Sequence, residues 1–525
     1  MLVNLKINSS SIKKNLEKIR SINENVICVI KDDAYGLKIE KILPILIKNN
    51  CNYFAVAYLE EAVKVYKILK NFKNLNKKNN CNVMTLNYVE PKKLEVAIKN
   101  GVEITIFSKK QFYDYIDILN NFKKNICLKI HIKINSGMNR LGFDENEVFE
   151  IIKEIKKINS EFLKDKKFKL EIISIFSHIS EAENKTETEK QVKKFEKILK
   201  IFDDNEIKYK YRHLQASPLL FKYEKKYNYD FCRVGMAIYG LEPLSYDVGL
   251  ENAILVESKI INIREVKKDE KVSYGNKGIL KRDSKVGIVA IGYAHGLPKQ
   301  IENKKNCAYV LVNDKKANIL GEICMDMIFI DLTDIQDVKI GDEVLIVGNK
   351  KSWKNKITLR QMAKWANTIQ DDVLTNFKID WKKDFYNSKE YKNNLTLPTQ
   401  VIENNNETVA KEIENTKPAQ SIDLPKDDNK NQVKIDENAA EKKKKEEQKK
   451  LEAQKLEQAK IAEQKRQEEA KKQARKQAEE KAKAEAKKKE AQTPKGPRKY
   501  IQVASVGSES SAKEITKKLG KNFYY

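Results

Sequence analysis

The sequence predicts an α/β protein: a (β/α)₈ barrel, then a mostly antiparallel β domain, then a low-complexity tail. Three observations lead to this prediction. Eight short apolar, β-branched runs lie between residues 26 and 240, and helical periodicity separates most of them. From about residue 250 the apolar runs are separated by turn signals instead. Beyond about residue 385 the composition becomes polar, and then repetitive in Lys, Glu, Gln and Ala.

The predicted barrel covers residues 1–245. Residues 59–71 and 186–202 are examples of its helices. Strands that alternate with helices indicate βαβ units, and eight such units over about 210 residues fit a closed barrel. A doubly wound open sheet is the alternative, although no GxGxxG segment follows an early strand. The eight predicted strands span residues 26–31, 53–58, 82–86, 103–108, 128–134, 171–179, 211–217 and 231–240.

The second predicted domain covers residues 246–385. Turn signals at 312–314 and 340–342 separate its strands, and residues 359–368 are expected to form a helix. Short apolar runs separated by turn signals indicate antiparallel β structure. The predicted strands span residues 253–264, 285–291, 308–312, 328–332 and 343–347.

Three segments are expected in the tail. Residues 386–440 are polar and predict a disordered linker, whereas residues 441–492 favour a solvated helix or disorder because they lack an apolar stripe. A strand pattern at 500–506 and a helix pattern at 511–519 follow. Residues 498–525 thereby resemble the first half of a SPOR domain, a peptidoglycan-binding module. Half of so small a domain cannot bury a core of its own, so a nonfunctional extension is the preferred interpretation.

Composition limits the function classes. Residues 441–490 contribute +7 of the formal net charge of +27, and no nucleic-acid-binding signature accompanies the charge, so no nucleic-acid partner is expected. Seven cysteines without a CxxC pair indicate free thiols and no metal site. The N-terminus lacks a signal-peptide pattern, and no run of about 18 apolar residues exists. We therefore expect a cytoplasmic protein without a membrane partner.

The most informative segment is Val29-Ile30-Lys31-Asp32-Asp33-Ala34-Tyr35-Gly36. A strand-like run ends in one lysine, Lys31. An ammonium group is strongly hydrated, and burial lowers its pKa, which suits Schiff-base chemistry with pyridoxal 5'-phosphate. The alternative is a lysine that simply leaves the sheet for solvent.

Further motifs occur in order along the chain. They are FAVAYLEEA at 54–62, KINSGMNRLG at 133–142, FSHISEAE at 176–183, RVGMAIYG at 233–240, VSYG at 272–275, GYAHG at 292–296 and GEICMDM at 321–327. With the Lys31 segment, they make residues 1 to about 385 resemble a bacterial alanine racemase. The resemblance implies pyridoxal 5'-phosphate as cofactor and L-alanine and D-alanine as substrates. It also implies a supply of D-alanine for peptidoglycan, and a homodimer whose active sites borrow residues from the partner.

The resemblance also assigns roles to individual residues. Lys31 holds the cofactor and acts as one base, and Tyr274 of the opposite subunit acts as the second. His178 lies beside the cofactor. Arg233 faces the pyridine nitrogen, with His213 supporting it. The phosphate ligands implied are Tyr35, Ser217, Gly235 and Met236.

For the substrate, the resemblance implies a carboxylate bound by Arg140 and by the backbone N–H of Met325. Lys133 takes the place of a carbamylated lysine that orients Arg140, and Cys324 and Asp326 come from the partner with Met325.

This chain departs from the family pattern in four places: Leu37-Lys38 replace His-Gly, Ala216 replaces an asparagine, His295 stands in GYAHG, and the closing tyrosine motif is unrecognisable near 379–381. The lost tyrosine puts the affinity for the cofactor in doubt. Two other activities stay open on the sequence: a pyridoxal-phosphate amino-acid decarboxylase and a racemase of broader specificity. A different class, an envelope protein that binds peptidoglycan through the tail, is opposed by the presence of Lys31 and Tyr274.

Overall fold

The computed structural model describes residues 2–71, 81–122, 125–165, 168–275, 277–302 and 308–379. The chain separates into two units, Met1–Pro418 and Ala419–Tyr525, and every described residue belongs to the first. The predictions for residues 386–440, 441–492 and 498–525 lie outside the described residues. Within the described ranges, no helix combines the length and the apolar character needed to cross a membrane.

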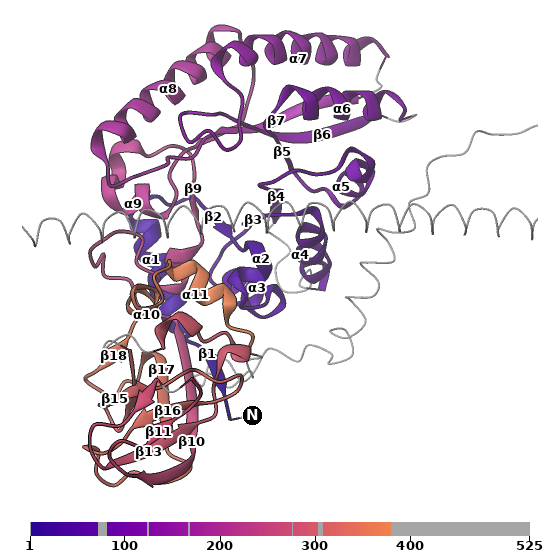
Figure 1. Cartoon of the computed structure of the whole chain (residues 1–525). Helices are drawn as coiled ribbons and strands as arrows, with labels where there is room; N and C mark the ends of the chain where they lie inside the picture. Colours follow the sequence, from indigo (N-terminus) through magenta and orange to yellow (C-terminus); the bar gives the residue numbers. More distant parts are fainter. Residues whose placement is uncertain are drawn as a thin grey trace, which may run out of the picture. The chain divides into compact units, whose positions relative to one another are not determined.

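The first part of the chain is an eight-stranded parallel barrel in two sheets (Figure 1). The strand orders are β4-β3-β2-β9 and β5-β6-β7-β8. Parallel bridges from Met84 to Glu103 and from Ala216 to Arg233 join the sheets at both seams and close the ring. All eight predicted barrel strands are confirmed, with shifted ends. They are β2 (Val26–Val29), β3 (Tyr53–Val56), β4 (Asn82–Thr85), β5 (Ile104–Ile106), β6 (Ile126–Lys133), β7 (Phe168–Phe176), β8 (Tyr211–His213) and β9 (Cys232–Val234).

Amphipathic helices connect the barrel strands, and local capping fixes where they begin. The Ser108 side chain accepts a hydrogen bond from the Gln111 N–H at the start of α6, and Asn184 does the same for Glu187 in α8. Their apolar faces pack on the strands and support the barrel from outside. The helices are α1 (Ser9–Ile22), α3 (Ile39–Lys48), α4 (Leu59–Asn71), α5 (Leu94–Asn100), α6 (Lys109–Asn120), α7 (Glu145–Asp165), α8 (Lys185–Asp204) and α9 (Ser217–Tyr223).

The second domain is built on an antiparallel sheet in the order β1-β10-β13-β16-β15-β14-β17-β18, and β10 also pairs with β17. Two helices, α10 (Leu359–Ala366) and α11 (Gln370–Asn376), follow the sheet, and α11 contacts the segment after β2. The strands are β10 (Ile254–Val266), β11 (Lys271–Val272), β12 (Gly278–Ile279), β13 (Ser284–Val289), β14 (Tyr309–Val312), β15 (Lys315–Leu320), β16 (Ile328–Asp331), β17 (Glu343–Asn349) and β18 (Lys356–Ile357). Short 3₁₀ turns are η1 (Pro91–Lys93), η2 (Glu224–Tyr227), η3 (Met236–Tyr239), η4 (Tyr293–His295) and η5 (Lys299–Ile301).

Two local features differ from the sequence prediction. The first strand of the chain, β1 (Asn4–Ile7), was not predicted; it pairs antiparallel with β10, with Ile7 opposite Ile254. Ser217 was expected to end a strand, but β8 stops at His213 and Ser217 begins α9. Pro218 suits this helical start, because a proline at the first turn sacrifices no intrahelical hydrogen bond.

Candidate functional site

The carboxyl ends of the barrel strands bring the predicted polar residues to one mouth. Lys31 follows β2, Lys133 ends β6, His178 follows β7 and His213 ends β8. Arg233 lies within β9, next to β2 in the sheet. Parallel strands end at the same rim of a barrel, so residues far apart in sequence converge there.

Lys31 enters a left-handed turn. Asp32, Asp33, Ala34 and Tyr35 have φ values of 52°, 54°, 58° and 59°, although none is glycine. A left-handed conformation costs roughly 1–2 kcal/mol per such residue, and strain of this kind gathers at functional sites. The Lys31 side chain is 42% exposed, and its Nζ lies 3.7 Å from Oδ2 of Asp32. The turn therefore ends the strand at the mouth, where the charge of Lys31 acts on His178 and Asp371.

Hydrogen bonds to α3 and α4 hold this turn in place. The Asp33 N–H donates to Oε1 of Glu61 at 2.8 Å. Oδ1 of Asp33 accepts from the Ile39 N–H and from Nζ of Lys64, both at 3.0 Å. These bonds, with Lys64 and Lys38 as counter-charges, hold the pKa of Asp33 below its usual value despite burial. Asp33 is consequently an ionised support for the strained segment.

Tyr35, at the end of the turn, lies against the backbone after β9. A β-carbon added at Gly235 would fall 2.1 Å from the Tyr35 Oη, so only glycine leaves room for the hydroxyl. Burial, and then the charge of Asp371, raise the pKa of Tyr35, while Met236 contributes a backbone hydrogen bond to it. Ser217 is buried at the start of α9, beside the seam where Ala216 bridges to Arg233.

Arg233 is 5% exposed and is tied to the ends of β7 and β8. Its Nη1 donates to Nδ1 of His213 at 2.7 Å and to the His213 carbonyl at 3.1 Å. Its Nη2 donates to the carbonyls of Ser177 at 2.6 Å and Leu214 at 3.3 Å, and lies 3.4 Å from Nδ1 of His178. Burial lowers the pKa of Arg233 to about 10, so the guanidinium stays charged at neutral pH.

His178 and Lys133 are neighbours of this fixed cation. Burial, and then the charges of Arg233 and Arg140, lower the pKa of His178 to about 3, so its imidazole is neutral at physiological pH. Lys133 is 7% exposed, and burial, followed by Arg140 and Arg233, lowers its pKa to about 8. Arg140 itself is exposed on a loop that begins after β6. Lys31, Lys133, Arg140 and Arg233 thus give the mouth four side chains that can carry positive charge, which suits an anionic ligand.

The remaining predicted residues form a second cluster in the β domain. The Ser273 hydroxyl lies 3.6 Å from Sγ of Cys324, and the N–H groups of Tyr293 and Ala294 donate to the carbonyls of Cys324 and Met325. Tyr274 is 69% and Met325 59% exposed, and Asp326 is also exposed. Among the described residues, no hydrogen bond or ion pair joins Tyr274, Cys324, Met325 or Asp326 to the Lys31 mouth of the same chain.

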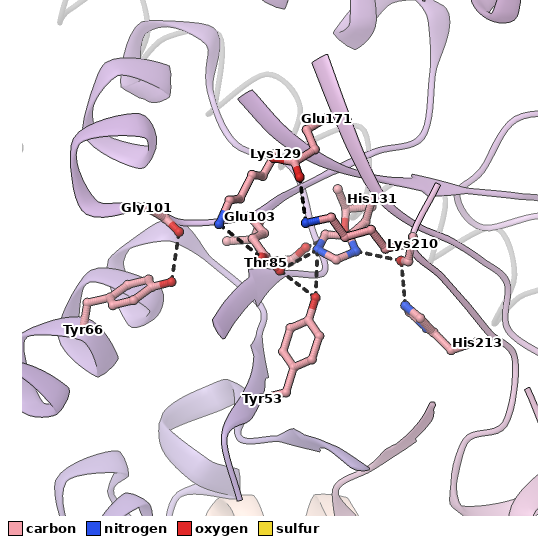
Figure 2. Close-up of polar contacts among 12 residues, drawn as sticks. Tyr53, Tyr66, Thr85, Gly101, Glu103, Lys129, His131, Glu171, Lys210 and His213 are labelled. Atoms are coloured by element: carbon pink, nitrogen blue, oxygen red, sulfur yellow. Dashed lines mark hydrogen bonds and ion pairs between the residues drawn. The ribbon is translucent and has the colours of Figure 1, made fainter. Parts of the chain in front are cut away.

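Sequence reasoning missed several groups near the mouth. Asp371 of α11 influences Tyr35, and its own pKa is raised by burial and opposed by the charge of Lys31. Glu103, His131 and Ser174 form a buried chain of hydrogen bonds that ends at His213. Figure 2 labels Glu103, His131 and His213 of this chain. Only the alternation along β6, which puts His131 on the same face as Lys133, could have indicated part of it.

The donor set can be tested against a phosphorylated pyridine. Tyr35 and Ser217 bring hydroxyls to the end of β8 and β9, where barrels bind phosphate, and Gly235 keeps the backbone open to close approach. A lysine is available for a covalent bond, and Arg233, which only donates hydrogen bonds, suits an accepting ring nitrogen. These residues fit pyridoxal 5'-phosphate.

Comparisons with known proteins agree with this fit. Residues 7–243 match the family model "Alanine racemase, N-terminal domain", and residues 253–384 match "Alanine racemase, C-terminal domain". Alanine racemase 1 of Clostridium acetobutylicum is 32% identical over 380 residues, which cover 70% of this chain and 91% of the relative. Alanine racemase of Helicobacter pylori strain HPAG1 is 31% identical over 384 residues, which cover 71% and 95%.

Solved structures give the same result. The alanine racemase of Clostridium difficile 630 superposes with a TM-score of 0.61 at 27% identity, covering 72% of this chain and 94% of that one. The Bacillus anthracis alanine racemase with bound L-Ala-P has a TM-score of 0.61 at 23% identity, with 72% and 93% covered, and supports the fold alone.

Proposed function

The chain belongs to the alanine racemase family and racemises alanine with pyridoxal 5'-phosphate, and from this premise we propose how its own residues share the work. The single observation that carries the proposal is the strained turn that places Lys31 at a mouth lined by Tyr35, Arg233 and His178. When bound there, the cofactor acidifies the α-hydrogen of an amino acid attached to it. Proton transfer, substrate binding and cofactor binding are assigned to residues of the chain.

Two bases on opposite sides are needed to invert a carbon centre. We propose that Nζ of Lys31 exchanges the α-proton on one side and that Oη of Tyr274 does so on the other. Tyr274 is 69% exposed, and no hydrogen bond or ion pair within the described ranges connects it to the mouth of its own chain, which favours a role in the active site of a partner subunit. The proposed enzyme is therefore a homodimer in which each mouth is completed by Tyr274, Cys324, Met325 and Asp326 of the other copy.

The substrate carboxylate is proposed to bind Arg140 and the backbone N–H of Met325. Lys133 supports Arg140 as a carbamate: its neutral amine bonds to carbon dioxide, releases a proton and becomes an anion. The pKa of about 8 favours this reaction because a sizeable fraction of the amine is unprotonated near neutral pH. The change would turn a repulsive Lys133–Arg140 pair into an attractive one.

Phosphate binding is assigned to Tyr35, Ser217 and the backbone of Gly235 and Met236. Arg233, held by His213, is proposed to donate to the ring nitrogen and keep it unprotonated, because a guanidinium has no acceptor. An unprotonated ring withdraws electrons more weakly, which limits side reactions such as transamination. His178 remains neutral and orients the cofactor.

The test is a racemase assay on purified full-length protein, with and without added pyridoxal 5'-phosphate, using alanine and serine. We expect interconversion of L-alanine and D-alanine that depends on the cofactor and is much slower with serine. Carbon dioxide release from either amino acid, without racemisation, would instead indicate the decarboxylase alternative.

The cellular role is proposed on the same basis. D-Alanine is a building block of peptidoglycan, so we propose that this enzyme supplies it in the cytoplasm. Binding of peptidoglycan through the SPOR-like residues 498–525 is the second candidate function. It is favoured only by the strand and helix patterns in that segment.

A further inference from the structure

A buried relay of five side chains runs through the barrel interior, away from the mouth. It consists of Arg233, His213, Ser174, His131 and Glu103, contributed by β9, β8, β7 and β6 and by the residue before β5. Each member is between 0% and 5% exposed. Figure 2 shows its far end, where Glu103 and His131 meet Tyr53. The inference below rests on the role proposed for Arg233.

The contacts of the relay are short and continuous. After the 2.7 Å bond from Arg233 to His213, Nε2 of His213 lies 2.7 Å from Oγ of Ser174. The same Oγ lies 2.7 Å from Nδ1 of His131, whose Nε2 is 3.1 Å from Oε2 of Glu103. The Ser174 hydroxyl has no other hydrogen-bond partner among the described residues, so its single proton must serve this chain.

Counting donors fixes the direction of every bond. Arg233 only donates, so Nδ1 of His213 must accept and its proton must lie on Nε2. His213 then donates to Ser174, which leaves the serine proton for Nδ1 of His131. His131 carries its own proton on Nε2 and donates it to Glu103.

The charges agree with this direction. Burial, and then the charge of Arg233, hold the pKa of His213 well below its usual value, so its ring is neutral. Burial is the largest single influence on Glu103 and opposes its ionisation, but the contributions of His131, Tyr53 and Lys129 together outweigh burial and lower the pKa of the carboxyl. An ionised carboxylate, which only accepts, therefore ends a chain that begins with a group that only donates.

We propose that Glu103 is a positioning residue for racemisation: by fixing the tautomers of His131 and His213, it keeps Nδ1 of His213 an acceptor for Arg233. With the opposite tautomers, an N–H of His213 would face an N–H of Arg233, and Nη1 would lose its side-chain anchor. The carbonyls of Ser177 and Leu214 would still hold Nη2. The guanidinium would then tilt and not leave the site.

The experiment compares four variants of the full-length holoenzyme. Glu103→Leu removes the acceptor, and Ser174→Ala cuts the relay in the middle. Glu103→Gln keeps an oxygen that His131 can donate to, and is the conservative rescue. Tyr53→Phe is the matched control, because Tyr53 donates to the same carboxylate at 2.6 Å without belonging to the relay.

Two readouts separate positioning from mere stability. The chain has four histidines, so ¹⁵N spectra of histidine-labelled holoenzyme can report each tautomer. In the wild type we expect His213 and His131 to carry a proton on Nε2 and to accept a hydrogen bond at Nδ1. Glu103→Leu and Ser174→Ala should change the His213 tautomer, lower kcat about tenfold and leave KM within about twofold. Glu103→Gln and Tyr53→Phe should retain both the tautomer and most of kcat.

A wild-type His213 protonated on Nδ1 would overturn the proposal. An unchanged His213 spectrum and an unchanged kcat in Ser174→Ala would also overturn it. Ser174→Ala removes only a hydroxyl group, so this test holds even if Glu103→Leu does not fold. Failure of the proposed function is distinguishable, because the wild type itself would then show no cofactor band or no racemisation.

Discussion

Two lysines at the same barrel mouth have different surroundings. The Lys31 side chain is 42% exposed, whereas Lys133 is 7% exposed, and burial lowers its pKa to about 8. Lys31 suits a covalent bond to a ligand that enters from solvent. Lys133 suits a permanent supporting role beside Arg140 and Arg233.

Lys31→Ala should abolish the visible absorption band of lysine-bound pyridoxal phosphate, because Lys31 is the lysine to which the covalent bond is assigned. The band is measured from the absorbance spectrum of the purified protein before and after cofactor addition. Lys38→Ala is the control, since Lys38 lies on the same segment and pairs with Asp33 at 3.2 Å. An unchanged band in Lys31→Ala would refute the assignment of Lys31 as the lysine that binds the cofactor.

Tyr274→Phe should retain bound cofactor but lose racemisation by orders of magnitude, with one direction affected more than the other. Phenylalanine has no hydroxyl to exchange a proton on one side of the substrate. Initial rates from L-alanine and from D-alanine measure the asymmetry. Tyr246→Phe, another exposed tyrosine, should change neither rate. Near-normal rates in both directions would show that Tyr274 is not a catalytic base.

Lys133 gives a stability prediction with a defined pH window. Its folded pKa of about 8 lies below the unfolded value of about 10.4, so the unfolded state binds more protons between these two values. The cost of burying the lysine is therefore complete below about pH 8 and disappears as the pH rises toward 10.4. Lys133→Met should raise the free energy of unfolding by up to about 3 kcal/mol at pH 7, and by nothing at pH 10.5.

Denaturant unfolding of cofactor-free protein in carbon-dioxide-free buffer measures this difference. Lys153→Met, at an exposed position of α7, is the control and should show no such pH dependence. A gain that stays constant with pH would contradict the prediction. In active enzyme, mass spectrometry under mild conditions should find Lys133 carrying carbon dioxide, and Arg140→Ala should mainly raise KM.

Among the elements, the left-handed turn after β2 invites a direct test. Asp32 has a φ of 52° and an exposed side chain, so a substitution there changes backbone strain without repacking the core. Asparagine tolerates this conformation, whereas a β-branched residue does not. Asp32→Val should lower the free energy of unfolding about 1–2 kcal/mol more than Asp32→Asn, measured on cofactor-free protein. Equal effects would mean that the turn relaxes in solution.

The same element shows what sequence reasoning can and cannot reach. The barrel strands were predictable because buried parallel strands are continuous apolar runs bounded by turn signals. The left-handed turn was not, since it contains no glycine before Gly36. Glu103, His131 and Ser174 were missed for a related reason: their contacts depend on the register of three neighbouring strands, and no local spacing reports that register. Lys31 and Arg233 were accessible because each stands in a motif.

For the whole molecule, we expect truncation after residue 390 to leave racemase activity and dimerisation intact. The described core extends to Phe377 and Ile379, which are both buried. Residues 386–492 carry no apolar periodicity that could add to it. Kinetics and light scattering of the truncated and full chains measure the effect. If the truncated protein were inactive or monomeric, the tail would be required for the enzyme. If the full chain, but not the truncated one, pelleted with peptidoglycan, the result would support the envelope-binding function.

The pairing of β1 with β10 has a consequence for the newly made chain. Ile7 leaves the ribosome about 250 residues before its partner Ile254, which at ordinary synthesis rates is a delay of roughly 10–50 s. Throughout that interval the barrel segments emerge and begin to fold while their first strand has no sheet to join. During synthesis the chain therefore carries one unpaired β-strand. An unpaired strand of this kind is a binding site for chaperones and can start aggregation.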